Sequence, residues 1–531
     1  MAKPIAQRSS EQLGTFRSPQ NVPGRVVTPV AYFTPPKGMN TLPPLSRLPP
    51  EYSPDMANLI LDQGVLISRK GLAEVGSPGG STVMAVFSFV NPDGLGFLFR
   101  LRIDGLDYWN GTGWTAVGGL TFTGSIHDRF TWTGWGDELL ICNGIDKIRS
   151  YNTRTGVVNV LDESFPCRHL TTFDSRVIAS ATLEGNFLGA RQRWSVKNDN
   201  TDWTSETTED GIGAGFEDLR GTPGGYVDEI MGTYPLSDDT ALVIRANSLW
   251  LQFVTGNVDA PFRYSRLTSE VGTRSRHSPV ATPYGIALLT LNDVVVVTQS
   301  GPQPIGQAVR RSIISDVGDP REVTGSYDPR RQEYRLCVGS TVWRYSFVDQ
   351  GWTRDQYGIE IRHLSFVDYR ALGLRIGELV GIIGDLTDTI GDLRRDEVDE
   401  GMHLVAAGFE QVLHETDAAS DDNDVAVPIS ITTGLLQSES PLDRTEIIEA
   451  QVEYESDEAQ ELIFEYSLDR GTSWLAYSVQ SIAPTTGPKV LAVRKTLTHH
   501  NLQIRVRSEN LGKLKLIGLY LFVVKGAKVN P

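Results

Sequence analysis

The chain has 531 residues, of which 40% are hydrophobic and 21% charged, so most of it should be globular rather than disordered. Its formal net charge of −16 argues against a protein that grips nucleic acid through a basic face. With 52 glycines, 28 prolines and 10 tryptophans, the composition favours many short strands and turns over long helices.

The three cysteines and the apolar runs give information about the cellular compartment of the protein. Cys142, Cys167 and Cys337 lack CxxC spacing, so they are expected to be small buried hydrophobic residues rather than metal ligands or disulfide partners. The first 16 residues lack the apolar stretch of a secretory signal, and the longest apolar runs are too short to span a bilayer. The sequence therefore predicts a soluble protein without a membrane-spanning segment.

Residues 1–60 are predicted to form a Pro-rich extended arm. Eleven prolines fall between Pro4 and Pro54, and proline fixes φ and removes a backbone donor, which excludes a helix or a central strand. Aromatic residues such as Phe16 and Tyr32 favour an arm that docks on its own body or on a neighbour. A disordered tail is the alternative.

Residues 61–390 are predicted to form an irregular β-propeller. A strand, a polar turn and a tryptophan recur: Trp109 leads to Trp114, Trp194 to Trp203, and Trp343 to Trp352. Strand clusters are expected near 81–119, 124–164, 167–208, 228–268, 272–306, 322–358 and 364–388. At about 40–45 residues per four-stranded blade this length holds roughly seven blades, with six to eight as the range. Two β-sandwiches placed back to back are the alternative.

Residues 391–427 are predicted to be an acidic linker or loop. Between Asp392 and Asp424, eleven acidic residues face two arginines, which is the composition of a solvated segment. The cluster Asp421-Asp422-Asn423-Asp424 could hold calcium, but it lacks the glycine and the glutamate of an EF-hand loop.

Residues 428–531 are predicted to form a β-sandwich or jelly-roll module of about seven strands. Apolar residues alternate with polar ones in three runs. These runs are Ile448, Ala450, Val452 and Tyr454; then Leu462, Phe464 and Tyr466; then Leu502, Ile504 and Val506.

No catalytic, cofactor-binding or metal-binding residue can be nominated. The segment Gly211 to Phe216 lacks the last glycine of the dinucleotide fingerprint, and no GxxxxGK[ST], HExxH or GxSxG motif occurs. The eight histidines are scattered, and each is interpreted as a lone surface or turn residue. The sequence therefore predicts a protein that is not an enzyme and that carries no cofactor.

One motif is typical of sialidase propellers. Ser467 to Trp474 fits the pattern S-x-D-x-G-x-x-W, called the Asp box, which is a hairpin turn. Its aspartate bonds backbone amides, its glycine takes positive φ, and its tryptophan packs beneath. The motif occurs once and outside the predicted propeller, so it indicates a turn rather than an active site.

Two stretches resemble the tail hub or nozzle proteins of short-tailed bacteriophages, including packaged-DNA stabilisation proteins. The first contains Gly38-Met39-Asn40, Leu48-Pro49-Pro50-Glu51, Ala57-Asn58-Leu59 and the run from Gly64 to Gly71. The second contains Thr432-Thr433-Gly434, the run from Ile447 to Tyr454, the Asp box, and the run from Leu502 to Ser508. The likeness covers both ends of the chain, and the middle is compatible with it.

This resemblance implies a structural virion protein that assembles in the bacterial cytoplasm and resides in the phage tail. It implies a ring of typically six copies below the portal and adaptor proteins, with tail fibres or a needle nearby. Double-stranded DNA would pass through the channel without specific binding, and an acidic wall would let it slide by repelling phosphate.

A glycan-active or glycan-binding propeller, either a sialidase-like hydrolase or a lectin, is the alternative function. A lectin could use Trp135, Trp203 or Trp352 as stacking platforms, although blade tryptophans more often belong to the core. A sialidase-like enzyme should carry Asp boxes inside its blades, and the predicted blades contain none.

Overall fold

The structure is a computed structural model that describes residues 27–205, 213–219, 228–257, 260–367, 402–407, 413–419, 421–422, 427–437, 444–509 and 514–527. Within these residues the regular structure is nearly all β-strand, so the predicted all-β class is confirmed. The described helices are α1 (Arg310–Asp316) and the 3-10 turn η1 (Leu45–Arg47). Neither is long or apolar enough to cross a membrane.

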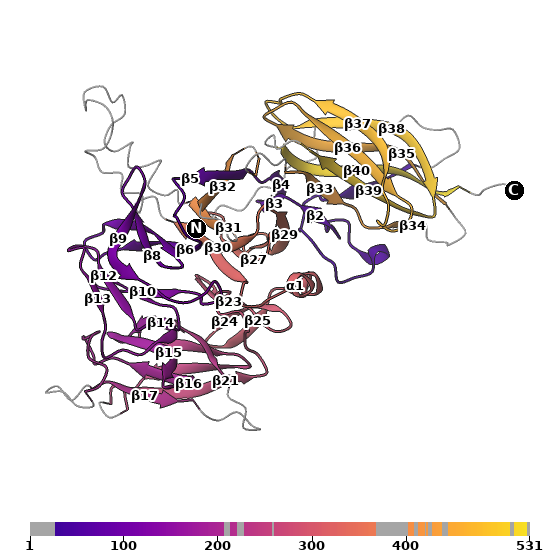
Figure 1. Ribbon diagram of the computed structural model, residues 1–531. Helices are drawn as coiled ribbons and strands as arrows, with labels where there is room; N and C mark the ends of the chain where they lie inside the picture. The colour runs from indigo at the N-terminus through magenta and orange to yellow at the C-terminus, as the bar shows by residue number, and fades with distance from the viewer. Residues whose placement is uncertain are drawn as a thin grey trace, which may run out of the picture. The chain divides into compact units, whose positions relative to one another are not determined.

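The chain divides into two compact units. The terminal unit consists of Met1–Leu72, Val342–Gly358 and Asp417–Pro531, so it contains both chain ends. The blade unit consists of Ala73–Thr341 and Ile359–Thr416. Each unit is described by itself below, and Figure 1 labels the elements of both.

Seven four-stranded sheets, counted over the described residues, resemble propeller blades. The first four are formed in chain order by β6 (Val83–Val90), β7 (Gly96–Arg102), β8 (Gly105–Trp109) and β9 (Trp114–Thr121); by β10 (Thr131–Trp135), β11 (Glu138–Cys142), β12 (Arg149–Asn152) and β13 (Val158–Val160); by β14 (Cys167–Phe173), β15 (Arg176–Glu184), β16 (Asn186–Trp194) and β17 (Gly215–Asp218); and by β18 (Ile230–Pro235), β19 (Thr240–Arg245), β20 (Ser248–Val254) and β21 (Phe262–Ser269).

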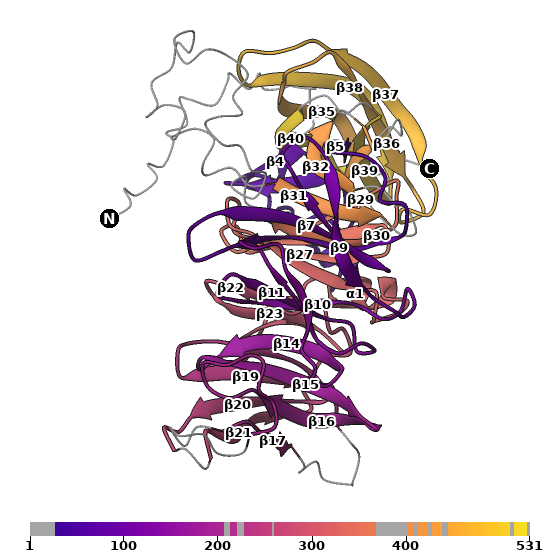
Figure 2. The ribbon, with the colours of Figure 1, turned by 60° about the vertical axis from the view of Figure 1, so that its left-hand side comes forward.

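The remaining three sheets complete this set. They are formed by β22 (Val280–Thr282), β23 (Gly285–Leu289), β24 (Val294–Thr298) and β25 (Gly301–Pro304); by β26 (Thr324–Asp328), β27 (Glu333–Val338), β28 (Thr341–Ser346) and β29 (Gly351–Gln356); and by β30 (Ile361–Val367), β31 (Met402–Ala407), β32 (Leu413–Ala419) and β5 (Gly71–Val75). Figure 2 shows the sheets of β14–β17 and β18–β21 from the side.

Six of the seven predicted strand clusters correspond to single sheets, and the seventh does not. The seventh sheet takes its later strands from residues 402–419, so the prediction of an acidic linker or loop is wrong for this stretch. Its last strand is β5, near the other end of the chain. Residues 368–388, where the prediction placed them, lie outside the described residues. Periodicity could not reveal this arrangement because β5 and β32 are about 340 residues apart in sequence and carry no local sign of their pairing.

The tryptophan pattern gives a hairpin in two of its three occurrences. Between β8 and β9, Asn110 Oδ1 accepts bonds from the backbone amides of Thr112 and Gly113, and Gly111 takes φ +97°. Trp343 and Trp352 likewise lie on consecutive strands, β28 and β29. The prediction of a second strand at Trp203 is wrong. Trp203 lies in a loop and is 1% exposed, because its ring packs into the core near β11 and β14.

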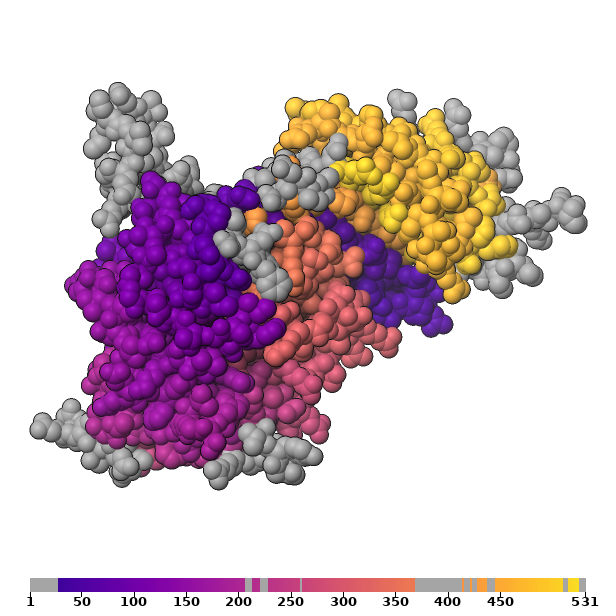
Figure 3. Space-filling view, viewed as in Figure 1, coloured from indigo at the N-terminus to yellow at the C-terminus, as the bar shows by residue number. Residues whose placement is uncertain are grey.

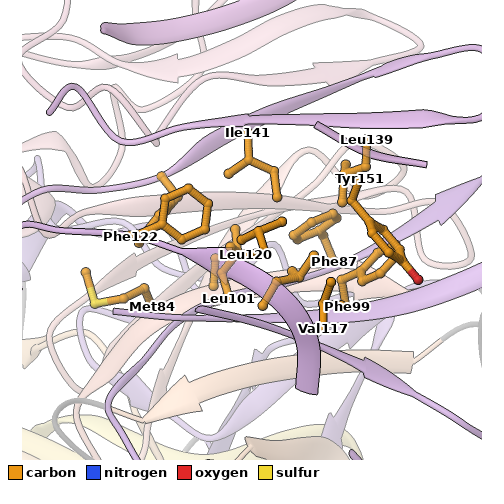
Figure 4. Packing of buried hydrophobic residues seen from close by; sticks show 13 residues of the cluster. Met84, Phe87, Phe99, Leu101, Val117, Leu120, Phe122, Leu139, Ile141 and Tyr151 are labelled. Carbon is orange, nitrogen blue, oxygen red and sulfur yellow. The ribbon is translucent and has the colours of Figure 1, made fainter. Parts of the chain in front are cut away.

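The core of the blade unit lies between successive sheets. Figure 4 shows one cluster, in which Phe87 and Phe99 from the first sheet pack with Leu139, Ile141 and Tyr151 from the second. Fully burying a side chain of this size contributes about 1.5–3 kcal/mol, so each interface between neighbouring sheets is a substantial source of stability.

The terminal unit contains two six-stranded sheets. One has the order β3 (Leu59–Asp62), β4 (Val65–Ser68), β40 (Leu514–Ala527), β35 (Arg444–Ser456), β38 (Lys489–His499), with β1 (Val27–Tyr32) also paired to β40. The other has the order β2 (Met56–Ala57), β33 (Ile429–Thr432), β39 (Asn501–Ser508), β36 (Gln460–Ser467), β37 (Leu475–Ile482), with β34 (Leu436–Gln437) also paired to β39. Leu66 and Val452 of one sheet and Ile431 and Val506 of the other line one small apolar void, so the two sheets face each other.

The extended arm predicted for residues 1–60 is part of a folded unit from Val27 onward, and residues 1–26 lie outside the described residues. β1 pairs antiparallel with β40 from Val27–Val524 to Tyr32–Leu519, and Met56 pairs with Ile431 of β33. Figure 3 shows the indigo N-terminal residues against the yellow C-terminal ones. Proline at position 29 is compatible with β1 because this strand pairs on one side only. From Val27 onward, this part of the chain therefore docks on strands of its own unit.

A buried ion pair joins distant segments of the terminal unit. Arg69 donates from Nη1 and Nη2 to the two carboxylate oxygens of Asp422, at 2.8 and 2.5 Å. It also donates to Asn58 Oδ1 and to the carbonyl of Gln356, and its guanidinium lies 4.0 Å from the centre of the Tyr357 ring. Asp422 belongs to the cluster for which calcium was considered. In this structure its carboxylate is the partner of Arg69 instead, and Asn423 and Asp424 lie outside the described residues.

Candidate functional site

The first strands of the sheets meet around one cavity of the blade unit. β10 contacts β14, β14 contacts β18, β22 contacts β26, and β30 contacts both β26 and β6. The cavity has a volume of about 510 Å³. Its wall takes residues from the first strand of six sheets, for example Trp132 (β10), His169 (β14), Tyr234 (β18), Ala281 (β22), Ser326 (β26) and His363 (β30).

Three of the eight histidines line this cavity. His169 lies on β14, His363 on β30, and His277 just before β22. The prediction that each histidine is a lone surface or turn residue is wrong for His169, His363 and His414, which are buried. His277 is half-buried and lies at the same cavity as His169 and His363 rather than alone. No sequence signal could have grouped them, because the spacing of 108 and 86 residues between them reflects only the length of the intervening sheets.

His169 and His363 act as acceptors at Nδ1. Backbone amides donate to them over long distances, from Thr233 to His169 at 3.4 Å and from Val86 to His363 at 3.5 Å. A neutral ring that accepts at Nδ1 carries its proton on Nε2. The rings are also packed, His169 against Tyr234 at 5.1 Å and His363 against Trp132 at 5.8 Å between ring centres. The β-strand backbone thus fixes the orientation of both imidazoles.

Burial keeps these imidazoles uncharged. It lowers the pKa of His169 to about 3, and the nearby Arg276 lowers it further. It lowers the pKa of His363 to about 3 in the same way, with Arg129 as the repelling charge. For His277 the pKa also lies well below the usual value, through burial and then repulsion by Arg129. All three are therefore neutral near pH 7.

Two arginines, Arg276 and Arg129, lie near these histidines. Arg276 donates to the carbonyls of Ile230 and Met231 at 3.0 and 2.9 Å, and to Glu229 Oε1 at 2.5 Å. The same carboxylate oxygen accepts a bond from Arg168 at 3.0 Å. Arg129 donates to the carbonyl of Arg362 at 2.8 Å, and burial lowers the pKa of the Arg129 guanidinium to about 10. None of the residues that line the cavity is an aspartate or a glutamate.

The wall offers neutral hydrogen-bonding groups and aromatic surface in a positive environment. Such a site can bind and orient a small molecule. Among the described residues, no three histidine, cysteine, aspartate or glutamate side chains are grouped so that they could hold a metal ion.

The tryptophans considered as stacking platforms are placed differently from one another. Trp203 and Trp352 are each 1% exposed, so neither ring face is available to a sugar, and the interpretation as core residues is confirmed for both. Trp135 is half-buried and packs against the cluster that contains Leu140 and Leu170.

The cysteines are buried, as the sequence predicted. Cys142 on β11 and Cys167 on β14 pack in the same cluster, and their thiols interact. This interaction and burial raise the pKa of Cys167 well above its usual value.

The Asp box forms the predicted turn between β36 and β37. Asp469 Oδ1 accepts a bond from the backbone amide of Ser473 at 2.8 Å, and Gly471 takes φ +87°. Bonds from Ser473 and Ser467 lower the pKa of Asp469 to about 2. Trp474 is covered by Arg505, whose guanidinium lies 4.3 Å from the ring centre. The carboxylate of Asp469 thus stabilises the turn.

Comparisons with known proteins add no family. No family model and no curated protein matches the chain. Among solved structures it is similar to two extracellular domains of hybrid two-component systems from B. thetaiotaomicron, with TM-scores of 0.40 and 0.38 and identities of 10% and 7%. It covers 39% and 42% of those two chains, and 66% of this chain is covered in each case.

A third similar structure is a chain of the mitotic checkpoint complex, with a TM-score of 0.38, 9% identity, and coverage of 66% of this chain and 94% of that one. At these TM-scores the likenesses support no argument about function.

Proposed function

We propose that this chain is a structural protein of a short-tailed phage tail, a hub or nozzle below the portal and adaptor, and that it is not an enzyme. The observation that carries this proposal is that both stretches resembling that family lie in the terminal unit. β2, β3 and β4 come from the first stretch, and β33, β35, β36 and β39 come from the second or border it.

Specific contacts join the two stretches. Ser53, between the segments of the first stretch, donates its hydroxyl to the carbonyl of Thr432 at 2.8 Å. Within the second stretch, Thr433 contacts the run from Leu502 to Ser508. Its Oγ1 accepts a bond from the amide of Ile504 at 3.0 Å, and its carbonyl accepts one from Gln503 Nε2 at 3.1 Å. Short motifs that are remote in sequence but form one hydrogen-bonded arrangement are better support for a relationship than the same motifs scattered over a fold.

In this proposal the seven four-stranded sheets are the blades of one irregular propeller, and the facing sheets of the terminal unit are a β-sandwich module. The first strands that surround the cavity correspond to the inner strands of the blades, and β5 completes the last blade from the other end of the chain. The pairing of β5 with β32 covers an edge of β32 that would otherwise present unpaired backbone groups.

The partners follow from the same proposal. The chain forms a ring of copies, typically six, docks on the portal–adaptor complex, and lies near tail fibres or a needle. Double-stranded DNA passes through the ring without specific binding, and the excess of acidic residues lets it slide. Charge reversal of acidic residues that face the channel should then slow genome ejection, and unchanged ejection would contradict the sliding idea.

Electron microscopy of the purified full chain tests the proposal, with the chain alone and mixed with the portal–adaptor complex of its phage. A ring with a central hole on that complex is the expected result, and its symmetry gives the copy number. Rings that form only when the adaptor is present also support the tail role. A chain that stays monomeric and never docks would overturn it.

The glycan-active or glycan-binding propeller is tested on the same preparation. Release of sugar from sialylated or capsular polysaccharides, or saturable glycan binding, would favour that alternative. Its structural support is weaker, because the one Asp box lies in the terminal unit and two of the three proposed platform tryptophans are buried.

A further inference from the structure

We propose that the cavity of the blade unit is a binding site for a small organic anion, one that combines an aromatic or apolar body with a carboxylate or phosphate head. This proposal does not rest on the tail role. It follows from the charge, the unpaired donors and the shape of the cavity wall.

The charge balance around the cavity is positive. Glu229 is shared by two guanidinium groups, those of Arg168 and Arg276, so one positive charge remains there uncompensated. Arg129 forms no ion pair within 4.0 Å among the described residues, and the carboxylate of Glu322 offsets its charge only from a greater distance. The wall itself carries no carboxylate, although the chain has 65 acidic residues. In a partly dehydrated cavity such an imbalance favours an anion more than it would at the surface.

Three polar side-chain atoms on the cavity wall or next to it have no partner within the described part of the chain. They are Nε2 of His277 and Oγ1 of Thr324, both on the wall, and Nη1 of Arg129, and all three are buried. Arg129 directly precedes Phe130 and Thr131, which line the cavity, and His277 is itself a lining residue. A buried donor without an acceptor destabilises the folded state, so an acceptor supplied by a ligand would relieve that cost. An anionic oxygen is the strongest such acceptor.

The rest of the wall suits an aromatic or apolar body. Phe130, Trp132, Tyr234 and Phe366 face the cavity, and the Trp132 ring is held by stacking on Phe87 at 4.0 Å between ring centres. A volume of about 510 Å³ lies within the range of small-molecule sites, about 300–1,000 Å³. An inorganic ion would leave most of this volume unfilled, whereas a compact aromatic anion would use both parts of the wall.

Isothermal titration calorimetry of the full chain tests this with three probes. Benzoate and phenyl phosphate carry an aromatic ring and an anionic head, and benzyl alcohol is the matched neutral molecule. We expect one equivalent of either anion to bind, and benzyl alcohol to bind at least about tenfold more weakly, the loss of one hydrogen bond to a charged group. Absence of binding by both anions, or equal binding of benzyl alcohol, would overturn the proposal.

Three variants test whether the anion binds in this cavity. His277→Phe removes the unpaired Nε2, which is the N–H donor in the tautomer that would bind an anion, and keeps a planar ring. It should therefore weaken anion binding about tenfold or more. His127→Phe is the matched control, because His127 is exposed in the same unit and does not line the cavity. Ala281→Trp fills the cavity from an exposed position on β22 without removing any polar group, and it should abolish binding.

Histidine-labelled NMR gives a readout that a purely structural role would not change. Benzoate should shift the resonances of His169, His277 and His363 and leave those of His127 and His500 unchanged. Equal weakening by His277→Phe and His127→Phe, unchanged binding in a folded Ala281→Trp variant, or shifts confined to histidines outside the cavity would each overturn the assignment.

Discussion

The Arg69 cluster of the terminal unit and the histidine cavity of the blade unit bury polar groups in opposite ways. Arg69 and Asp422 have side chains that are 0% and 1% exposed, and they neutralise each other through two hydrogen bonds. The cavity holds three neutral imidazoles near arginines, and three buried polar atoms on or next to its wall lack partners in the described part of the chain. A fully paired cluster holds remote segments in register, whereas an unpaired one leaves binding capacity for a ligand.

We expect the largest effect from a variant that breaks the Arg69–Asp422 ion pair. Arg69→Met leaves the Asp422 carboxylate buried and unpaired, so the free energy of unfolding of the terminal unit should fall by about 3–5 kcal/mol. Lys37→Met is the control, because the Lys37–Glu51 pair is half-exposed at 3.5 Å and should contribute less than about 1 kcal/mol. Urea denaturation followed by circular dichroism measures both.

A double variant separates pairing from packing. If charge pairing is the cause, Arg69→Met combined with Asp422→Leu should recover part of the stability lost by Arg69→Met alone. Equal or greater loss in the double variant would mean that the bonds from Arg69 to Asn58 and Gln356, rather than the ion pair, hold the cluster.

The next effect is a pH dependence from the cavity. The folded-state pKa values of His169 and His363 are about 3, below the ordinary 6.5, so as pH falls the unfolded chain binds protons first. Stability should therefore be lost between about pH 6.5 and pH 3, at about 1.4 kcal/mol per pH unit for each such histidine once the pH is well below 6.5.

One variant assigns that slope to the cavity. His363→Gln cannot titrate, so its stability should fall less steeply with acid than that of the unmodified chain. Urea midpoints measured at several pH values give the slope of each chain, and equal slopes for His363→Gln and the unmodified chain would contradict the burial of a neutral His363.

The smallest effect concerns the Asp-box turn. Gly471→Ala places a side chain at φ +87°, which should cost about 1 kcal/mol because the left-handed region is strained for alanine. Gly487→Ala is the control in the same unit, because that glycine has no positive φ and open space around it. Thermal unfolding of both variants gives the difference, and equal melting temperatures would mean that the turn tolerates the substitution.

Local patterns predicted a large part of the fold. Alternation placed Ala450, Val452 and Tyr454 in the core of the terminal unit, where they are at most 6% exposed. The same pattern was wrong for Ile448, because an irregularity in strand pairing between Ile447 and Glu449 shifts the phase and buries Ile447 instead. The sequence predicted no part of the candidate site, because no spacing rule shows that His169, His277 and His363 meet at one cavity.

The sequence by itself determined the all-β class, most strand clusters, the Asp-box turn and the burial of the cysteines. Each of these depends on a few neighbouring residues, through period-two alternation or turn chemistry. The tertiary structure alone decided that β5 completes the last four-stranded sheet, that β1 to β4 join strands from the other end of the chain, and that Arg69 meets Asp422 across 353 residues. It also decided where His169, His277 and His363 meet. These are long-range contacts selected by packing and charge pairing, and a local pattern contains no information about them.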